Sequence, residues 1–224
     1  MSDLTEPDGG DGAAGGAVAG GGTNGSREGD PAAVRRRPGG RAARVREAVL
    51  AAAMEMLAEG GVTRLSIAGV AARAGVNETT VYRRWGSREK LVLDAMLAAS
   101  DEGIPVPDTG AVRTDLAAFA RALAGYTATP LGRAVVRSAA LGADDPALAE
   151  SWQAFWQSRL DQAGAIVRRA VERGELPAET DTVLALELLS APIQARALLG
   201  HRAIEPDLPE RLADLVLDGL RGRP

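Results

Sequence analysis

The sequence contains no cysteine and a single histidine, His201. Both shortages exclude several kinds of metal site and catalytic site. Without cysteine there is no disulfide framework, no thiolate metal site and no cysteine nucleophile. One histidine does not build a histidine-rich metal site, and the acidic residues show no clustering that suits a metal ion. His201 lies in a short loop-like stretch, which argues against a nucleophile–histidine–acid triad. We therefore expect no catalytic residues, no metal and no cofactor, in a protein that is not an enzyme.

Long uninterrupted hydrophobic runs are also missing. The most apolar stretch, residues 183–199, is interrupted by Glu187, Pro192, Gln194 and Arg196. These interruptions disfavour a membrane span, and the N-terminus has no basic region followed by an apolar run that would form a secretory signal. With 46% hydrophobic residues in 224, the chain has enough apolar side chains for a sizeable core. We expect a soluble cytoplasmic protein with no membrane partner.

Charge is distributed very unevenly along the chain, although the net charge is only −4. Residues 1–34 hold six acids and one Arg, a net charge of −5, and residues 91–224 hold nineteen acids and thirteen Arg, a net charge of −6. Residues 35–90 hold twelve Lys or Arg and five acids, a net charge of +7. A basic segment in an acidic protein is typical of binding to an anionic partner. Nucleic-acid phosphate is the leading candidate, and a solvated surface is the alternative.

Residues 1–34 consist mainly of Gly, Ala, Asp and Ser, with almost no large apolar side chain. Such a segment cannot bury enough surface to offset the entropy of ordering. We therefore expect residues 1–40 to be a disordered, low-complexity tail that ends in a basic arm. The G-x-G-x-x-G spacing of Gly10, Gly12 and Gly15 is attributed to chance, because no strand precedes it and no helix follows it.

From Arg41 onward, apolar residues recur at three- and four-residue steps, which predicts helices almost throughout. The first helix is expected to stop at Gly60–Gly61. Three more are expected to begin at the caps Ser66, Asn77 and Ser87. After a linker that contains two prolines, helices are predicted at about 112–127, 130–142, 146–173, 178–199 and 207–221. The predicted fold is all-α, with a helix-turn-helix module at residues 41–86 and a larger helical regulatory and dimerisation body at residues 87–224.

The segment around residues 66–85 reads as helix, tight turn, helix, with a supporting helix before it. In a helix-turn-helix the second helix lies in the DNA major groove, while its apolar positions hold it against the other two. Val81 and Trp85 are four residues apart and are expected to face inward. The side chains left facing outward are Thr79, Thr80, Arg83 and Arg84. Arginine pairs bidentately with guanine, and threonine reaches base edges or a thymine methyl.

The stretch "RVREAVLAAAMEMLAEGGVTRLSIAGVAARAGVNETTVYRRWGSREKLVLDAM" resembles the DNA-binding domain of the TetR/AcrR family of bacterial transcriptional regulators. The similarity covers roughly residues 43–96 without a gap. It lies in the first helix ending in Glu-Gly-Gly, in "IAGVAARAGV", in a Thr-x-Tyr-x-x-aromatic recognition helix and in "SREKL". Together these motifs are specific, although each alone is weak.

The resemblance implies a role for each position of the recognition helix. Thr79, Thr80 and Arg83 would face base edges, and Tyr82 and Arg84 would lie near the groove wall or the phosphates. Ser66 and Arg88, at the starts of two helices, would hold phosphate. Glu78 has two possible roles, which are accepting from cytosine N4 or turning away from the phosphates.

The run "RRRPGGRAARVR", residues 35–46, holds six arginines and no acid. One interpretation is an N-terminal arm, including Arg41 and Arg44, that lies on phosphates or in an adjacent minor groove. The other is a solvated linker. Because the run adjoins the recognition module, the arm is favoured.

The last two predicted helices carry more apolar residues than one thin layer needs: Leu184, Leu186, Leu188, Leu189, Ile193, Leu208, Leu212, Leu215, Val216 and Leu220. The resemblance implies that these helices pair with their symmetry mates in a homodimer. The alternative is that they form only the core of a monomer.

Aromatic residues make up only 3% of the chain, yet Trp152, Phe155 and Trp156 lie close together. The resemblance implies a small-molecule pocket in the helical body, and these rings would help to line it with Met96, Arg121, Tyr126 and Gln194. The alternative is ordinary core packing of the aromatic side chains.

The function implied is that of a homodimeric repressor of transcription, bound to a palindromic operator in double-stranded DNA and released by a small-molecule effector. Two alternatives remain within DNA binding, namely a dimer without an effector and an activator. A protein–protein adaptor is a further alternative, and it predicts no salt-sensitive DNA binding.

Overall fold

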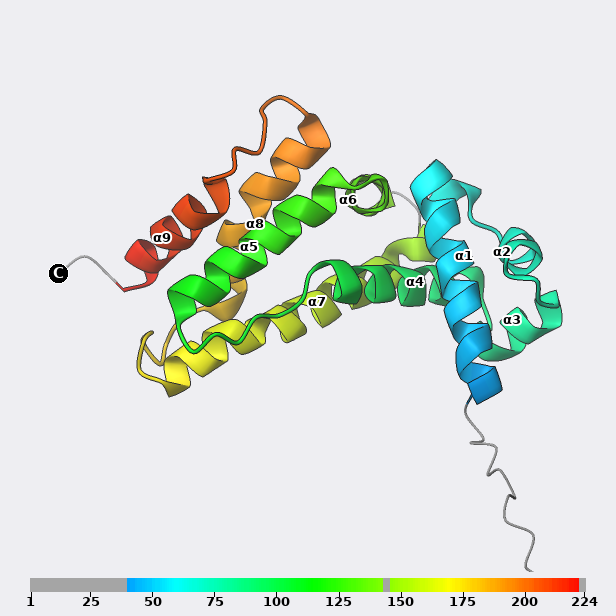
Figure 1. The fold of residues 1–224 in the computed structure, drawn as a ribbon, viewed down its shortest axis with the longest axis horizontal. Coiled ribbons are helices and arrows are strands. Elements are labelled where there is room, and N and C mark those ends of the chain that lie inside the picture. The colour runs from blue at the N-terminus through cyan, green and yellow to red at the C-terminus, as the bar shows by residue number, and fades with distance from the viewer. Residues whose placement is uncertain (1–39, 143–145, 222–224) are drawn as a thin grey trace, which may run out of the picture. The chain divides into compact units, whose positions relative to one another are not determined.

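The computed structural model describes residues 40–142 and 146–221, so nearly all of the expected N-terminal tail and the first part of the basic arm, residues 35–39, lie outside the described residues. Within these ranges the chain forms helices and no strand, which confirms the all-α prediction. The helices, labelled in Figure 1, are α1 (Gly40–Arg64), α2 (Ile67–Ala74), α3 (Glu78–Trp85), α4 (Arg88–Gly103), α5 (Val112–Ala128), α6 (Pro130–Gly142), α7 (Pro146–Glu172), α8 (Thr182–Leu199) and α9 (Leu208–Leu220).

The three predicted side-chain caps are confirmed. Ser66 Oγ accepts from the Gly69 amide at 3.1 Å, and Asn77 Oδ1 accepts from the Thr79 amide at 2.9 Å. Ser87 Oγ accepts from the third amide of α4 at 3.3 Å. Each cap satisfies a backbone donor that has no partner inside its helix, and so fixes where the helix begins.

One glycine interrupts α1, and another ends α2. α1 is interrupted at the predicted position, where Gly61 has φ 67° and ψ −171°, but one further helical turn then follows to Arg64. α2 ends at Gly75, whose φ of 65° and ψ of 33° lie in the left-handed region. A residue without a side chain adopts that conformation at little cost. The tight turn between α2 and α3 therefore depends on Gly75.

Two hydrophobic clusters hold the described helices together. The first joins α1–α4 and extends to α6 and α7, with Leu57, Val81, Trp85 and Trp152 among its members. The second joins α5, α7, α8 and α9. In Figure 1, α5 lies alongside α8 and α9, and all three pairs of these helices are in contact. α7 has residues in both clusters and therefore connects them, and it also contacts α4.

The final two helices divide their apolar residues between the core and the surface. α8 begins at Thr182 rather than at residue 178, because Asp181 Oδ1 accepts from the Leu184 amide at 3.0 Å and caps the helix there. The buried members of the predicted set are Leu186, Leu189, Ile193, Leu208, Leu212 and Val216. By contrast, 48% of Leu184, 52% of Leu188 and 68% of Leu215 are exposed in the single chain.

Candidate nucleic-acid interface and effector cavity

The third helix, α3, has one buried face and one exposed face. Val81 and Trp85 are buried in the first hydrophobic cluster, as their four-residue spacing predicts. Five other side chains of α3 are exposed, namely Glu78, Thr79, Tyr82, Arg83 and Arg84, whereas Thr80 is half-buried. The exposed part of α3 thus presents two guanidinium groups, a phenol, a threonine and, at its start, a carboxylate.

Neighbouring groups restrain two of these exposed side chains. The hydroxyl of Thr79 donates to Asn77 Oδ1 at 2.8 Å, which leaves its lone pairs and methyl group for an outside contact. Arg84 Cζ lies 5.5 Å from the centroid of the Trp85 ring, within the range of a cation–π interaction. Arg83 makes no ion pair with any residue that the structure describes.

A carboxylate that the sequence does not single out also contacts α3. Trp85 Nε1 donates to Asp94 Oδ2 at 3.1 Å, and the same oxygen lies 3.3 Å from Nη2 of Arg46. Asp94 on α4 therefore connects to α3 and to α1. No motif marks it, because the contact depends on the angle at which α3 and α4 cross.

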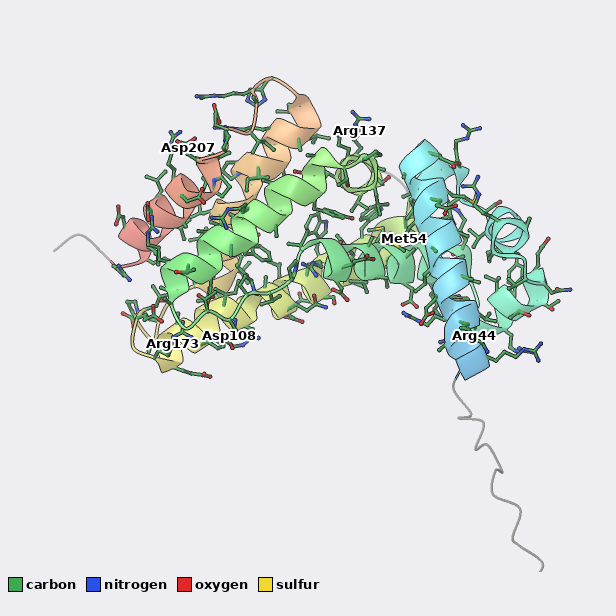
Figure 2. The ribbon with its side chains drawn as sticks, in the orientation of Figure 1. Arg44, Met54, Asp108, Arg137, Arg173 and Asp207 are labelled. Carbon is green, nitrogen blue, oxygen red and sulfur yellow. The ribbon has the colours of Figure 1, made fainter. Side chains whose placement is uncertain are left out.

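The cations of α1–α4 fall into two groups. Those paired with an acid are Arg46, Arg73 and Arg88. Those without an acidic partner among residues 40–142 and 146–221 are Arg41, Arg44, Arg64, Arg83, Arg84 and Lys90. Arg44 lies in the first turns of α1, as Figure 2 shows, and its Nε donates to the Gly40 carbonyl at 3.0 Å. The unpaired cations leave net positive charge available to an anion.

Arg88, for which the resemblance implies a phosphate contact, makes hydrogen bonds inside the protein. Its Nε donates to the carbonyl of Leu65 at 2.8 Å, and its Nη2 donates to the carbonyl of Val62. The side chain is half-buried. In this structure Arg88 therefore joins the start of α4 to the connection between α1 and α2.

Ser66 and Glu78 both lie at exposed helix starts. Ser66 Oγ is occupied by the cap of α2, although a hydroxyl has further hydrogen-bonding capacity. Glu78 is the first residue of α3. An acid in the first turn is stabilised by the helix dipole, which gives Glu78 a local role in addition to the two expected ones.

A cavity of about 460 Å³ lies among α4, α5, α6, α7 and α8. Four of the residues predicted for a pocket line it: Tyr126, Phe155, Trp156 and Gln194. Three others are placed elsewhere. Met96 and Trp152 are buried in the first hydrophobic cluster, and Arg121 pairs with Glu210 of α9 at the surface.

The three neighbouring aromatic residues of α7 form a chain of edge-to-face contacts. The ring centroids of Trp152 and Phe155 are 6.1 Å apart with an interplanar angle of 89°, and those of Phe155 and Trp156 are 5.2 Å apart at 68°. Phe155 belongs to the first cluster and also lines the cavity. Both earlier interpretations, core packing and pocket lining, thus describe part of this group.

Two polar residues of the cavity, Ser100 of α4 and Arg159 of α7, were not singled out in the sequence. Arg159 donates to Asp101 Oδ1 at 2.9 Å, to Gln162 Oε1 at 2.7 Å and to the Ile104 carbonyl at 3.0 Å. In the sequence Arg159 resembles any other arginine of a solvated helix. Only the crossing of α4 and α7 reveals that it is buried.

The ring of Tyr126 is packed against a glycine. A Cβ atom added to Gly103, at the end of α4, would lie 2.3 Å from Tyr126 Cδ2, which is closer than atoms approach without a shift. The lack of a side chain at Gly103 thus lets the tyrosine ring lie against the end of α4. This contact helps to set where the tyrosine hydroxyl enters the cavity.

Comparison with known proteins agrees with this arrangement. Residues 49–95 match the family model of bacterial regulatory proteins of the tetR family, and residues 106–216 match that of the tetracyclin repressor-like C-terminal domain. The HTH-type transcriptional regulator AqdR of Rhodococcus erythropolis is 37% identical over 179 residues, covering 80% of this chain and 86% of AqdR.

Two further similarities extend over most of the chain. The DNA-binding transcriptional repressor TetR of Mycobacteroides abscessus is 33% identical over 181 residues, covering 76% of this chain and 90% of that repressor. The crystal structure of the TetR family transcription regulator SCO0332 matches with a TM-score of 0.68 and 31% identity, covering 79% of this chain and 98% of that one. This chain therefore belongs to the TetR family and is a DNA-binding transcriptional regulator.

Proposed function

We propose that the protein acts as a cytoplasmic homodimeric repressor that binds a palindromic operator and leaves it when a small-molecule effector enters the cavity. Residues 41–86 form the DNA-reading module in this proposal. Residues 87–224 form the dimerisation and effector-binding body. The arginines before residue 41 supply a basic arm.

The observation that carries the DNA-binding assignment is the division of α3 into two faces. Its buried face fixes the helix to the module through Val81 and Trp85, so the exposed face keeps a constant orientation. Arg83 and Thr79 on that face have the chemistry to read base edges. Tyr82, Arg84, Arg41 and Arg44 are assigned to the groove wall and the phosphates, and Ser66 to a phosphate.

The proposal of a dimer rests on the exposed leucines of the last two helices. Leu184 and Leu188 are one turn apart on α8 and therefore share a face. Leu215 on α9, a helix in contact with α8, adds a third exposed leucine. A large exposed apolar patch marks an interaction site. A second copy of the chain would remove these side chains from water and place two reading helices on one palindrome.

The proposal of an effector rests on the cavity and its position. Its volume of about 460 Å³ lies within the range of small-molecule sites, roughly 300–1,000 Å³. α4 lines the cavity through Ser100 and contacts α3 through Asp94. An effector releases DNA only if it binds the released conformation better than the DNA-bound one.

Selection of binding sites from genomic DNA with the purified protein tests the DNA-binding assignment. The expected result is a palindrome with half-sites about one helical turn apart or a multiple of it, whose affinity falls as salt is raised. Recovery of random fragments, or binding that does not depend on salt, would contradict the proposal. Melting of the protein against a metabolite library then tests the effector, because a ligand that binds only the folded state raises the melting temperature.

A further inference from the structure

Two hydroxyl groups in the cavity are buried and have no partner. Ser100 is 1% exposed and Tyr126 is 7% exposed. Ser100 Oγ and Tyr126 Oη make no hydrogen bond to any residue that the structure describes. Both residues line the cavity, one from α4 and the other from α5. A buried polar group without a partner is rare in proteins and calls for a ligand group or another explanation.

The third polar group beside them is a guanidinium with donors to spare. The side chain of Arg159 is only 8% exposed, and the structure gives it three hydrogen bonds, two from Nη1 and one from Nη2. A guanidinium has five N–H groups, so Nε and one donor of Nη2 remain. Its ion-pair partner, Asp101, is half exposed and thus balances the buried charge only in part.

The protonation states suit hydrogen-bond donation by all three groups. Burial raises the pKa of Tyr126. The Ser100 hydroxyl is near enough to the phenol to oppose this shift, as does the charge of Arg159, but the two hydroxyls do not have the geometry of a hydrogen bond. The phenol therefore stays protonated at neutral pH. Burial lowers the pKa of Arg159, and Asp101 opposes this change. An arginine side chain is not deprotonated in proteins, so the guanidinium of Arg159 remains charged.

We propose that the effector is an amphipathic molecule whose anionic oxygen group is held by Tyr126, Ser100 and Arg159, while its aromatic or alkyl body fills the apolar part of the cavity. This inference rests on the proposed function and specifies the class of effector. A carboxylate or sulfonate accepts from hydroxyl and guanidinium donors at once. The apolar body would lie against Phe119, Leu123 and Trp156. Glu187 also lines the cavity, which favours a single negative charge over two.

A pair of fluorescent probes that differ in one group tests this proposal. The first, 8-anilinonaphthalene-1-sulfonate, has an aromatic body and a sulfonate. The second, N-phenyl-1-naphthylamine, has the same body without the sulfonate. We expect the full-length wild-type protein to bind the sulfonate probe at least about tenfold more tightly, because hydrogen bonds to a charged group are strong.

Two variants remove the unpartnered hydroxyls without adding atoms. Tyr126→Phe and Ser100→Ala are each expected to weaken binding of the sulfonate probe about tenfold and to leave binding of the neutral probe unchanged. Both variants are expected to fold, because each removes a polar atom that has no hydrogen bond to lose. Ser158→Ala is the matched control, since Ser158 is half-buried on α7 outside the cavity lining.

The outcomes separate this inference from the proposed function. If both probes bind equally and the two variants change neither affinity, the cavity has no anionic anchor and the inference is overturned. If neither probe binds, the inference is overturned as well. DNA binding measured by site selection is independent of both results, and effector release remains open to test with neutral or cationic compounds.

Discussion

Trp85 Nε1 donates a hydrogen bond to Asp94 Oδ2 at 3.1 Å, and this contact joins the last residue of the recognition helix α3 to the middle of α4. The same carboxylate oxygen pairs with Arg46 of α1 at 3.3 Å. One carboxylate of α4 thus contacts both α3 and α1. We expect this contact to help orient the exposed face of α3, together with the buried side chains of Val81 and Trp85.

Asp94→Ala is expected to weaken DNA binding although Asp94 is not on the exposed face of α3. Without this acceptor the indole N–H of Trp85 loses its partner, so the free energy of unfolding is expected to fall by about 1 kcal/mol or more. Fluorescence anisotropy with operator DNA and denaturant unfolding measure the two effects. Asp94→Asn keeps an acceptor and is expected to restore most of both. Glu102→Ala, an exposed acid on the same helix, serves as control, and an equal loss in that variant would contradict the role of Asp94.

Arg88→Ala is expected to lower the free energy of unfolding by about 1–3 kcal/mol, because two backbone carbonyls lose a charged donor. Thermal unfolding without DNA is the measurement. If Arg88 instead contacts a phosphate, the variant is expected to keep its free energy of unfolding. The slope of the logarithm of the DNA-binding constant against the logarithm of the salt concentration would then become shallower by about 1. That second result would show that the guanidinium leaves its internal position when DNA is bound.

Arg83→Ala is expected to relax base preference at one position of each half-site, at a cost of about 1–3 kcal/mol for the preferred base. Affinities for operators with single base changes, measured at one salt concentration, show the effect. Arg168→Ala removes the same charge from the exposed surface of α7 and is the control. Equal losses on specific and random DNA would mean that Arg83 contacts phosphate instead.

Leu188→Glu is expected to convert the dimer to a monomer, since it places a charge in the proposed apolar interface, where burial without a partner is costly. Sedimentation equilibrium measures the mass of the protein in solution and so distinguishes a dimer from a monomer. Operator affinity is expected to fall steeply, because the two half-sites are no longer bound together. Ala154→Glu, on the exposed side of α7, adds the same charge elsewhere and is expected to leave the mass unchanged. A dimeric Leu188→Glu variant would move the interface away from α8.

Glu175→Gln is expected to make stability less sensitive to acid. The amide of Val112 donates to Glu175 Oε2 at 2.8 Å, and this bond, with help from Arg173, holds the pKa of the carboxyl below its usual range. A carboxyl with a lowered folded-state pKa stabilises the fold above its ordinary pKa of about 4.3 and loses that effect as pH falls through the lowered value. Urea unfolding at a series of pH values from 6 to 3 measures how steeply the free energy of unfolding falls with pH. Glu179→Gln, in the same loop, is the control.

Features set by neighbouring residues in the chain were predictable from the sequence. Ser66, Asn77 and Ser87 begin helices because each offers an oxygen to an amide two or three positions later. The inward positions of Val81 and Trp85 follow from helical periodicity, which fixes the exposed face of α3 as well. The family resemblance then predicts what the residues of that face contact.

Features set by helix crossings were not predictable in the same way. The burial of Arg159 depends on where α7 meets α4, and the pairing of Arg121 with Glu210 depends on where α5 meets α9. No spacing along the chain encodes these distances. Of the residues predicted for a pocket, Trp156 and Gln194 line one cavity, whereas Arg121 lies at the α5–α9 surface.

Because Gly103 lies against the ring of Tyr126, a substitution at this glycine would change the shape of the cavity. A methyl group at Gly103 would push the tyrosine ring away from α4 and move its hydroxyl relative to Arg159, without changing any residue of the DNA-reading module. One small substitution at the end of α4 would thus alter the size and polarity of the cavity together. If the cavity holds the proposed effector, such a substitution would change which effectors bind and leave the DNA-reading residues as they are.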